Sequence, residues 1–573
     1  MRAAVPLGGP SFSAVERVAN LERLSREPLD VLVIGGGITG AGVALDAASR
    51  GLRTGMVEQD DFASGTSSRS SRLIHGGLRY LSQREFGLVR EALVERQQLL
   101  RLAPHLVRPL PFLIPVLVGS GAARKTRARA VGRAVGAALW AYDVAGGSRI
   151  GRNHRRLDRQ ELLRLVPALE GSRVAGGFLY YDAQADDARL TLAVVKSAAL
   201  EHGAAVANYA GARALYEGPG GTWRVEVEDR LSRISFEVAT SCVVDATGVW
   251  AGGLVARPQG PSLRPAKGVH LTLAADRLRL GAAVVLPVQE DGRSIFLVPS
   301  FDRAYLGTTD TDHAGGPDRP MCTGDDARYL LSALSASLAE PVGMASVTGS
   351  WAGLRPLLAS ASGRTADLSR RHVVSVEGGI VTVVGGKLTT YRRMAAQAVD
   401  AVLRVLEVKA PPSRTAGLVL FGAGADAAAA VLAGQDPPPP AIPEPPPPVP
   451  TGATAGGHAH LAGRYGTYAS AVAVLAEGPG DLGSPLVAGL PYLRAEATYA
   501  VRHEMVLTLE DLLVRRTRAL ALDREATARA APAAASLLGG ELGWSAEEVR
   551  RQIEVFSNLV EAERQSLSAS GAG

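Results

Sequence analysis

The sequence has very little cysteine and no long hydrophobic run. Cys242 and Cys322 are the only cysteines among 573 residues, which excludes a disulfide scaffold and any zinc or iron–sulfur site built on cysteines. No stretch of 18 apolar residues occurs, so no transmembrane helix is expected. The first 30 residues carry several charges from Glu16 onward and lack the apolar segment of a signal peptide. These absences predict a protein of a reducing compartment that is soluble or lies on a membrane surface.

Charge of neither sign dominates the whole chain, but basic residues are concentrated in one segment. The chain has 62 Lys and Arg against 56 Asp and Glu, with a formal net charge of +6. Between residues 101 and 165 there are 13 basic residues and 3 acidic ones. Such a patch indicates an anionic surface or nucleic acid as a partner. Nucleic acid is not expected, because the aromatic interleaving of a single-strand binder is missing.

Apolar runs, turns and prolines divide the chain into four predicted segments. Residues 1–28 are a polar, partly helical N-terminal extension, and residues 29–435 mix β-type runs and helical stretches, which predicts an α/β nucleotide domain interleaved with a strand-rich domain. Residues 436–450 hold ten of the 34 prolines and are interpreted as a linker. A long surface loop within one domain is the alternative. Residues 451–573 have helical spacing and predict a small all-α C-terminal domain.

A glycine pattern at the start of the α/β part predicts a dinucleotide site. The apolar run 31–34 is followed by Gly35, Gly37 and Gly40 in a G-x-G-x-x-G pattern, and a helical stretch comes next. These glycines permit a tight turn, approach of a pyrophosphate to a helix N-terminus, and close helix–strand packing. Glu58 lies 18 residues past Gly40, where a carboxylate accepts hydrogen bonds from ribose hydroxyls and repels a 2′-phosphate. FAD or NAD is therefore favoured over NADP.

Two later segments favour FAD over NAD. Residues 243–248 form an apolar strand ending in Ala-Thr-Gly, with Thr247 and Gly248, about 200 residues after the first motif. Large flavoproteins return to their nucleotide this late in the chain. Residues 381–390 contain a strand, then Gly385, Gly386 and Lys387, and then a helix. The positive end of that helix, together with Lys387, would stabilise the anion of reduced flavin.

The segment 66–81, TSSRSSRLIHGGLRYL, closely resembles the FAD-dependent, membrane-associated glycerol-3-phosphate dehydrogenases. The resemblance continues in residues 103–107, 186–190, 267–270, 307–310, 354–357, 385–392, 465–467, 503–504 and 515–518. It covers roughly residues 29–540 and is very specific in the first segment. It implies a Rossmann-like FAD-binding domain interleaved with a strand-rich substrate domain, followed by a small all-α C-terminal domain. The family places this last domain beside the catalytic part, where it is a candidate for homodimer contacts.

The resemblance implies a substrate and a reaction. sn-Glycerol 3-phosphate would be oxidised to dihydroxyacetone phosphate by hydride transfer from C2 to flavin N5, with a membrane quinone as electron acceptor. Such chemistry needs a phosphate clamp, a base, and stabilisation of charge on the oxygen. Arg79 and Arg355 are the expected clamp, because a guanidinium matches phosphate bidentately. Tyr80 and Thr309 are expected to add neutral hydrogen bonds to the substrate.

Two histidines are candidates for the base, because histidine titrates near neutral pH. We favour His270, which follows Lys267 and Gly268 into a strand that the resemblance places over the flavin. His75 is the second candidate and alternatively orients flavin or substrate. Lys387 is expected to stabilise either the flavin or the substrate alkoxide, and the sequence does not divide these roles. No metal is expected.

The candidate cofactor contacts combine the glycine motifs with the 66–81 segment. They are Gly35, Gly37, Gly40, Glu58, Thr66, Ser67, Ser70, Leu73, Thr247, Gly248, Gly385, Gly386, Lys387, Leu388 and Thr389. The hydroxyls at positions 66, 67 and 70 suit a pyrophosphate or a flavin. Their alternative role is simply to form turns.

A basic helical stretch over 124–142 predicts a membrane-docking element. Its candidate contacts are Arg124, Lys125, Arg127, Arg129, Arg133 and Trp140. Val131, Val135, Leu139 and Tyr142 recur at helical spacing, with Arg129 and Arg133 on the opposite face. A basic amphipathic helix is typical of a membrane interface, and a solvated helix packed on its own domain is the alternative. We therefore expect a cytoplasmic protein that binds anionic lipids peripherally at the inner face of the cell membrane.

Three other functions fit part of the pattern. An oxidase of the same fold would pass electrons to O2 and make hydrogen peroxide. An amine or amino-acid oxidase shares the glycine motifs but would need a carboxylate clamp. A flavin-binding sensor without turnover would have lost its base or its clamp, yet His270, Arg79, Arg355 and Lys387 are all present.

Overall fold

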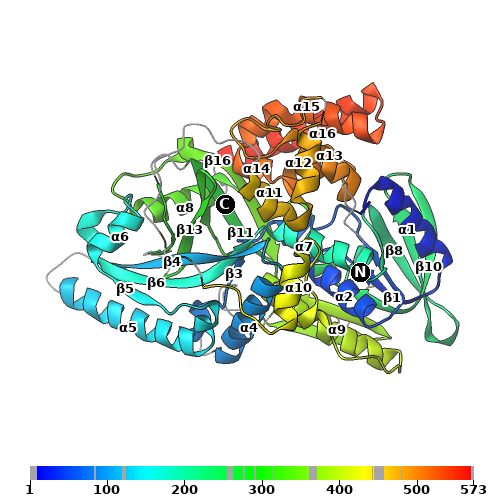
Figure 1. Cartoon of the computed structure of the whole chain (residues 1–573), viewed down its shortest axis with the longest axis horizontal. Helices are drawn as coiled ribbons and strands as arrows, with labels where there is room; N and C mark the ends of the chain where they lie inside the picture. Colours follow the sequence, from blue (N-terminus) through cyan, green and yellow to red (C-terminus); the bar gives the residue numbers. More distant parts are fainter. Residues whose placement is uncertain are drawn as a thin grey trace.

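Two β-sheets and a group of C-terminal helices make up the molecule (Figure 1). The computed structural model describes residues 10–82, 85–118, 124–253, 262–274, 278–288, 292–313, 315–359, 371–439, 441, 443, 457–478 and 480–569. Within these ranges, the side chains of Arg79, Ser82, Arg124, Lys125 and Arg127 are outside the described part. The roles predicted for Arg79, Arg124, Lys125 and Arg127 therefore lie outside the described residues. The same holds for most of the linker predicted at 436–450.

The first sheet is built on the predicted βαβ opening. Its strands are β1 (Leu29–Ile34), β2 (Thr54–Val57), β7 (Ala205–Ala207), β8 (Ala210–Glu217), β9 (Trp223–Asp229), β10 (Ile234–Asp245), β17 (His372–Glu377) and β18 (Ile380–Gly385). Their order is β17-β18-β10-β1-β2-β7, with β9 paired to β10 and β8 paired to β9. β1 runs parallel to β2 and β10, and β10 runs parallel to β18. Because parallel strands share a carboxyl edge, the three glycine motifs that follow β1, β10 and β18 meet there.

Two helices cover this first sheet next to the motifs. α2 (Ile38–Ser49) follows β1, and α9 (Tyr391–Val405) follows β18 and packs against α2. Gly42 makes this approach possible, because a Cβ on it would lie 2.8 Å from a ring carbon of Tyr391. The small residues of α2 thus bring the two helix N-termini to the same edge of the sheet.

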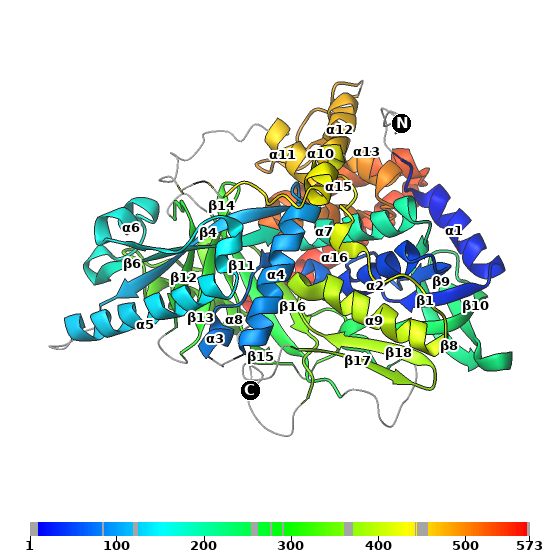
Figure 2. The same ribbon diagram turned by 60° about the horizontal axis from the view of Figure 1, so that its bottom comes forward.

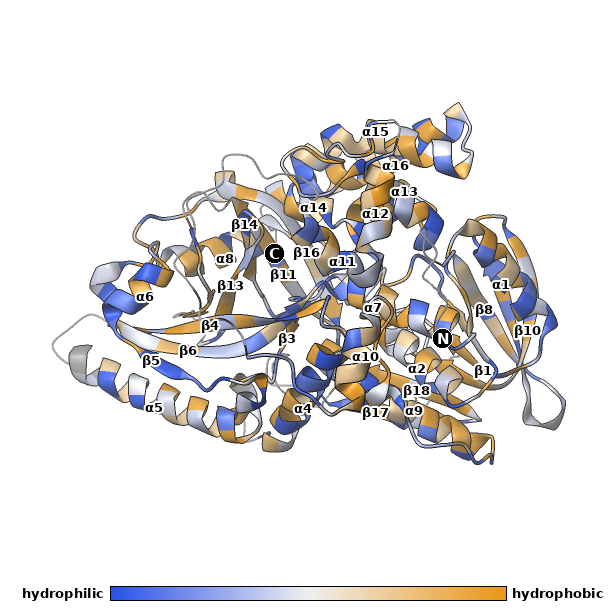
Figure 3. Cartoon of the chain, viewed as in Figure 1, coloured by the Kyte–Doolittle hydropathy of each residue, from blue (hydrophilic) through white to orange (hydrophobic). Residues whose placement is uncertain are grey.

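The second sheet carries His270 and Arg355, two of the residues predicted to act on the substrate. Its strands are β3 (Leu73–Ile74), β4 (Val107–Leu117), β5 (Arg155–Leu157), β6 (Val174–Ala185), β11 (Ala266–Ala274), β12 (Ala283–Pro287), β13 (Ser294–Ser300), β14 (Arg303–Gly307), β15 (Thr311–Asp312) and β16 (Val347–Arg355). Their order is β15-β11-β14-β13-β12-β4-β6-β3, with β16 beside β11 and β5 beside β6. In the register of β11, His270 is opposite Trp351 of β16 and Gly307 of β14. Strands such as β4 and β13 are mostly hydrophobic (Figure 3).

The C-terminal part is helical, as predicted. It contains α11 (His458–Tyr465), α12 (Ala469–Ala476), α13 (Arg494–His503), α14 (Ala519–Leu522), α15 (Arg524–Leu542) and α16 (Ala546–Ser568), which gather on one side of the molecule (Figures 1 and 2). Leu509, Leu512, Leu538 and Phe556 belong to a core of its own. α14 is fastened to the second sheet, because Thr272 Oγ1 donates a hydrogen bond of 2.5 Å to the Ala521 carbonyl.

The N-terminal extension is integrated into the α/β body. α1 (Ala14–Arg26) lies along the first sheet, where Leu24 is fully buried. Arg17 pairs with Asp229 and donates a hydrogen bond to the Asn208 carbonyl. Phe12 stacks on Phe62 in the main core. Residues 12–26 therefore contribute buried contacts to the first sheet.

The remaining helices surround the second sheet and the junction between the sheets. They are α3 (Arg79–Ser82), α4 (Phe86–Leu102), α5 (Arg124–Val144), α6 (Arg159–Leu165), α7 (Asp187–Lys196), α8 (Gly324–Ser335) and α10 (Gly424–Leu432). α5 lies at the periphery, next to the second sheet (Figures 1 and 2). In the described ranges, no helix combines the length and the apolar character that crossing a membrane requires.

The structure corrects the face assigned to α5. Leu139 and Tyr142 are 0% and 1% exposed, and the Tyr142 hydroxyl donates to Asp182 and accepts from the Gly76 amide. The part of the predicted apolar stripe at Leu139 and Tyr142 therefore packs on its own domain, where burial against the second sheet removes apolar surface from water, whereas Val131 of the same stripe is 45% exposed. The outer side of α5 instead presents Trp140, which is 65% exposed, and Val144, which is 69% exposed.

Candidate active site

A cavity of about 380 Å³ lies where β1, β10 and β18 end. Most of the predicted cofactor contacts line it, namely Gly35, Gly37, Glu58, Thr66, Ser67, Thr247, Gly248, Gly385, Gly386, Lys387 and Leu388. Three motifs that are far apart in the sequence thus form one site. The sequence analysis missed Gln59, Ala210, Ala212, Trp250 and Pro356, which also line it. Of these, Gln59 and Pro356 directly follow predicted site residues, which is the signal that could have found them.

The glycines of the first motif fit a dinucleotide. A Cβ on Gly40 would lie 1.8 Å from the Gly35 carbonyl oxygen, and one on Gly35 would lie 2.6 Å from the Ala246 carbonyl oxygen. Both positions are therefore closed to any side chain. Ser67 Oγ accepts a hydrogen bond of 2.9 Å from the Ile38 amide, in the first turn of α2. The helix N-terminus, Gly37 and a hydroxyl thus meet at the cavity wall, which is the arrangement that binds a pyrophosphate.

Glu58 supports the glycine loop in addition to facing the cavity. Its Oε2 accepts a hydrogen bond of 2.7 Å from the Gly36 amide, and its Oε1 accepts one of 2.9 Å from the Asp60 amide. Burial raises the pKa of this carboxyl to about 7. A ribose hydroxyl that donates to Glu58 would favour the ionised form. The residue therefore suits the predicted ribose contact while it also fixes the turn.

Four of the predicted cofactor contacts support the site from behind. Gly40 permits the close packing described above. Ser70 donates hydrogen bonds from its amide and its hydroxyl to Asp187 Oδ2, at 2.9 and 2.7 Å. Leu73 is buried in the hydrophobic cluster beside β4 and β6. Thr389 Oγ1 accepts a hydrogen bond of 3.3 Å from the His75 amide. These residues hold the loops that form the cavity wall.

Arg355 lies at the rim of this cavity, at the end of β16. Its Nη1 donates to Asp310 Oδ1 at 3.1 Å, and its Nη2 donates to Thr308 Oγ1 at 3.0 Å. The next residue, Pro356, lines the cofactor cavity. The guanidinium passes over Gly268, where a Cβ would lie 2.5 Å from Nη2. A charged fork is thus held in a fixed orientation next to the cofactor site.

Tyr80 and Thr309, which are also predicted to contact the substrate, have different surroundings. Lys387 Nζ lies 3.9 Å from the centroid of the buried Tyr80 ring, which places Tyr80 beside the cofactor cavity. Thr309 is 2% exposed, and its hydroxyl accepts a hydrogen bond of 3.0 Å from the Val269 amide. The Thr309 hydroxyl therefore serves β11 and the loop that orients Arg355. A hydrogen bond between Thr309 and the substrate stays a prediction.

His270 is buried beside the charged fork. Its ring stacks on Trp351 with centroids 4.7 Å apart, and its Nε2 lies 2.9 Å from Ser71 Oγ. Within the described part of the chain, its Nδ1 is a buried atom with no hydrogen-bond partner. Burial, followed by the positive charges of Arg355 and Arg72, holds the pKa of His270 well below its usual value. The ring is therefore a neutral acceptor at physiological pH.

His75 occupies a different position from His270. Its amide bonds to Thr389, and its ring meets Phe296 edge-on with centroids 6.4 Å apart. These neighbours of His75 thus come from the cofactor segment 388–390 and from β13 of the second sheet, whereas the charges that act on His270 include Arg355. This difference favours His270 as the group nearer to the phosphate clamp.

Arg72 and its aromatic partners were missed by the sequence analysis. The Arg72 guanidinium lies 4.4 Å from the Trp351 ring centroid and 5.8 Å from that of Tyr305. Trp351 is four residues before Arg355 on the same strand, so the period-two alternation of β16 places both side chains on one face. That alternation is the signal that could have identified Trp351 as part of the site.

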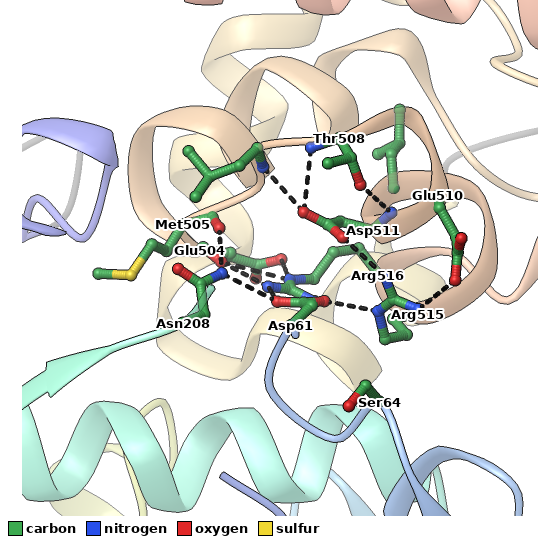
Figure 4. Close-up of polar contacts among 12 residues, drawn as sticks. Asp61, Ser64, Asn208, Glu504, Met505, Thr508, Glu510, Asp511, Arg515 and Arg516 are labelled. Carbon is green, nitrogen blue, oxygen red and sulfur yellow. Dashed lines mark hydrogen bonds and ion pairs between the residues drawn. The ribbon is translucent and has the colours of Figure 1, made fainter. Parts of the chain in front are cut away.

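A buried ionic network joins the cofactor part to the C-terminal helices (Figure 4). Asp61, three residues after Glu58, is 0% exposed and accepts hydrogen bonds from Arg515 Nε at 2.7 Å and Arg516 Nη1 at 2.6 Å. Arg516 also donates to the Glu504 carbonyl. The structure shows a network.

The two cysteines are buried and free. Burial raises the pKa of each thiol to about 12. Because the thiolate is the reactive and metal-binding form, neither cysteine is prepared to act as a ligand or a redox partner.

Comparison with protein families gives two matches along the chain. Residues 30–392 match the FAD dependent oxidoreductase family. Residues 413–549 match the C-terminal domain of alpha-glycerophosphate oxidase, and this match begins before the proline-rich segment. The first match confirms FAD as the cofactor for which the cavity is built, and the second covers much of the helical part.

Individual proteins resemble the chain over nearly its whole length. A glycerol-3-phosphate dehydrogenase of Mycobacterium leprae is 40% identical over 553 residues, which cover 96% of this chain and 91% of that protein. Glycerol-3-phosphate dehydrogenase 2 of Mycobacterium tuberculosis is 39% identical over 572 residues, covering 97% and 93%. The crystal structure of a glycerol-3-phosphate dehydrogenase from Bacillus halodurans, complexed with FAD, is 31% identical, has a TM-score of 0.75 and covers 98% of this chain and all of that one.

Proposed function

We propose that this chain, which belongs to the family of FAD-dependent glycerol-3-phosphate dehydrogenases, oxidises sn-glycerol 3-phosphate to dihydroxyacetone phosphate. The electrons then pass to a membrane quinone. Arg355 carries this proposal within the structure. It is an oriented guanidinium at the rim of the cofactor cavity, and its charge acts on the buried His270. These contacts support the roles that the proposal assigns, with Arg355 as the phosphate clamp and His270 as the proton acceptor next to the flavin site.

FAD supplies a hydride acceptor when it is bound in the cavity. Gly35, Gly37 and the N-terminus of α2 would hold its pyrophosphate, and Glu58 its ribose. Lys387 and the Gly385-Gly386 turn would hold the other end of the cofactor, because they follow β18 and line the opposite part of the same cavity. The positive charge of Lys387 favours negative charge near that end.

Arg355 would bind the phosphate of the substrate. Guanidinium and phosphate match in geometry, and a partly buried site strengthens their attraction. Asp310 keeps the fork oriented before the substrate arrives. Arg79 is proposed as the second arm of the clamp from the family resemblance, and Tyr80 would face the substrate beside Lys387.

His270 would accept the proton of the C2 hydroxyl. When Nε2–H donates to Ser71 Oγ, the Nδ1 lone pair remains as the acceptor. The low pKa of His270 in the free protein keeps this lone pair unprotonated. A phosphate dianion on Arg355 would offset the repulsion from that arginine, so substrate binding would raise the basicity of His270 toward the range that suits a general base.

Electron transfer to a quinone is proposed from the outer side of α5. Trp140 and Val144 project there, together with the exposed Arg129 and Arg133. Apolar and basic groups on one exposed side are suited to the boundary between lipid headgroups and acyl chains. We therefore propose peripheral association with the inner face of the cell membrane, where a lipid-soluble acceptor is available.

The experiment that tests this function is anaerobic. The FAD-loaded protein is mixed with sn-glycerol 3-phosphate, and the flavin absorbance is followed with glycerol as the matched control. Bleaching by the phosphate ester alone is expected, because glycerol has no group for Arg355. A bound flavin that remains oxidised with sn-glycerol 3-phosphate would overturn the proposal.

Transfer of electrons to O2 is the second candidate, because residues 413–549 match the C-terminal domain of an oxidase family. The two acceptors are distinguished by measuring hydrogen peroxide formed per substrate oxidised, with and without a short-chain quinone. If a quinone is the natural acceptor, the hydrogen peroxide formed should fall well below one molecule per substrate oxidised when quinone is present. Equal peroxide yields in both conditions would establish the oxidase.

A further inference from the structure

A second cavity, of about 290 Å³, lies between the second sheet and the C-terminal helices. Its charged lining consists of Arg72, Arg108, Arg189, Arg464 and Arg518, with Asp186 as the acidic member. None of its described lining residues belongs to the wall of the cofactor cavity. Its volume is near the lower end for small-ligand sites and is several times that of one water.

Unsatisfied donors are concentrated around this cavity. Among the described residues, the buried nitrogens with neither a hydrogen bond nor an ion pair include Nε and Nη2 of Arg72, Nε of Arg518 and Nε of Arg189. All three of these arginines line the cavity. Buried polar groups in native proteins normally have partners, so a cluster of unsatisfied donors around one space indicates that an acceptor belongs there.

Three of the five arginines that line the cavity form ion pairs, and two do not. Arg189 pairs with Glu504, Arg464 with Glu496, and Arg518 with Asp187. Within the described part of the chain, Arg72 and Arg108 make neither an ion pair nor a side-chain hydrogen bond. Arg72 lies over the aromatic faces of Trp351 and Tyr305, and its charge, after those of Arg518 and Arg464, helps to hold the pKa of Asp186 below its usual value. Buried guanidinium nitrogens without an acceptor, as in Arg72, are unfavourable, and an anion between Arg72 and the exposed Arg108 would supply that acceptor.

The packing of α11 makes room for one of these arginines. A Cβ on Gly463 would lie 1.7 Å from Arg108 Nη2. The missing side chain at position 463 therefore allows the guanidinium of β4 to pass over the helix at the cavity wall. The site is thus shaped from both sides, by β4 and the segment before β3 on the sheet and by α11 on the C-terminal part.

We propose that this cavity is a second anion site that binds a phosphate group, separate from the phosphate clamp of the active site. Its donors come from several directions, which suits the tetrahedral oxygens of a phosphate better than the planar oxygens of a carboxylate. The phosphate is either free or carried by a small metabolite. Because its ligands come from both parts of the chain, bound phosphate would link the C-terminal helices to the substrate sheet.

The direct test is a crystal of the FAD-loaded full chain soaked in sodium arsenate, a phosphate analogue with an anomalous signal. We expect an anomalous peak within hydrogen-bond distance of Arg72 and Arg108. A map with a peak at Arg355 and none between Arg72 and Arg108 would overturn the proposal. The cavity readout does not depend on turnover, so the outcome is separate from that of the proposed function.

Titration calorimetry in solution tests the same site and its source of phosphate. Inorganic phosphate is added to the FAD-loaded wild type, to Arg108→Gln and to Arg224→Gln, which removes an exposed arginine of the first sheet as a matched control. We expect Arg108→Gln to weaken one class of binding at least about tenfold, corresponding to the loss of a charged hydrogen bond. Turnover of sn-glycerol 3-phosphate should stay unchanged in that variant. Wild-type binding in Arg108→Gln would contradict the proposal.

Two further arms complete the design. Glycerol 2-phosphate replaces inorganic phosphate as a probe: binding of both indicates a site for the phosphate group itself, and binding of the ester alone indicates a metabolite site. Failure of both to bind the wild type would overturn the proposal. Gly463→Ala serves as an independent variant if Arg108→Gln does not fold, because alanine suits the helix interior and displaces the Arg108 guanidinium. It should weaken the same class of binding.

Discussion

Asp61 and Arg516 form a buried ion pair between the cofactor-binding part of the chain and its C-terminal helices. Arg516 Nη1 lies 2.6 Å from Asp61 Oδ2, and Arg515 Nε lies 2.7 Å from the same oxygen (Figure 4). Asp61 belongs to the loop that begins at Glu58, so the helical part contacts the wall of the flavin site itself. Because all three groups are desolvated, removing Asp61 leaves the buried charge of Arg516 without its near carboxylate, whereas Arg515 keeps Asp511 and Glu510.

The first prediction concerns this network. Asp61→Asn should lower the free energy of unfolding by about 3–5 kcal/mol, since it leaves two buried guanidinium groups without their shared carboxylate. Urea unfolding of the FAD-free protein measures the change. Asp60→Asn is the matched control, because Asp60 pairs with Arg230 in a half-exposed position and should cost less than about 1 kcal/mol. Equal losses of unfolding free energy in the two variants would show that the buried network stabilises the protein no more than an exposed ion pair does.

The second prediction concerns the glycine motif. Gly40→Ala should strongly reduce FAD retention, because its Cβ would lie 1.8 Å from the Gly35 carbonyl oxygen and would displace the turn that receives the pyrophosphate. The measurement is the flavin-to-protein ratio after purification. Gly87→Ala, where a Cβ meets nothing within 4 Å, should keep full flavin content. Full flavin in Gly40→Ala would mean that the turn can move without losing the cofactor.

The sequence could predict those parts of the site that follow from local strand–turn–helix patterns, and it could not predict those that depend on how distant elements pack. Gly35, Thr247 and Gly385 could be brought together in advance, because parallel strands share a carboxyl edge. The direction of Leu139 and Tyr142 in α5 could not, since helical spacing shows that residues share a face without showing what that face contacts. Thr309 was placed by a family motif, but its hydroxyl is used by Val269 in a contact that depends on strand register.

Long-range charge pairing was the least predictable feature. Asp61 and Arg516 are separated by 455 residues in the chain, and no local signal connects them. The cavity between Arg72 and Arg108 likewise exists only because α11 packs across β4 at Gly463. Such features follow from the docking of two separately patterned parts, whereas the flavin motifs are local to strand–turn–helix units.

The third prediction concerns His270. His270→Gln should lower the anaerobic rate of flavin reduction by about 10²- to 10⁴-fold, the usual contribution of a general base, while flavin content stays normal. His458→Gln replaces an exposed histidine and should have no effect. If His75→Gln lowers the rate while His270→Gln does not, the base is His75.

The pH dependence of the same step gives the fourth prediction. The charge of Arg72 contributes to holding the pKa of His270 below its usual value. Arg72→Gln removes a positive charge, which favours the protonated ring and raises that pKa. The acid limb of kcat/KM, measured from pH 5 to 9, should therefore move to higher pH in Arg72→Gln. Arg224→Gln provides the control, and a limb that stays in place in both variants would contradict the assignment of this limb to His270.

The outer side of α5 leads to the fifth prediction. Replacing both Arg129 and Arg133 with Gln should weaken binding to anionic vesicles by about thirtyfold, from the loss of about 1 kcal/mol per basic residue near the surface. Trp140→Ser combined with Val144→Ser should weaken it further by loss of apolar contact, whereas Val474→Ser, at a 51% exposed position among the C-terminal helices, should not. Co-sedimentation at low and high salt separates the electrostatic contribution of the arginines from the apolar contribution of Trp140 and Val144, because ions screen only the electrostatic one. If neither pair of substitutions changes co-sedimentation, a different surface contacts the membrane, and the route proposed for the quinone fails with it, since α5 is the element on which that route depends.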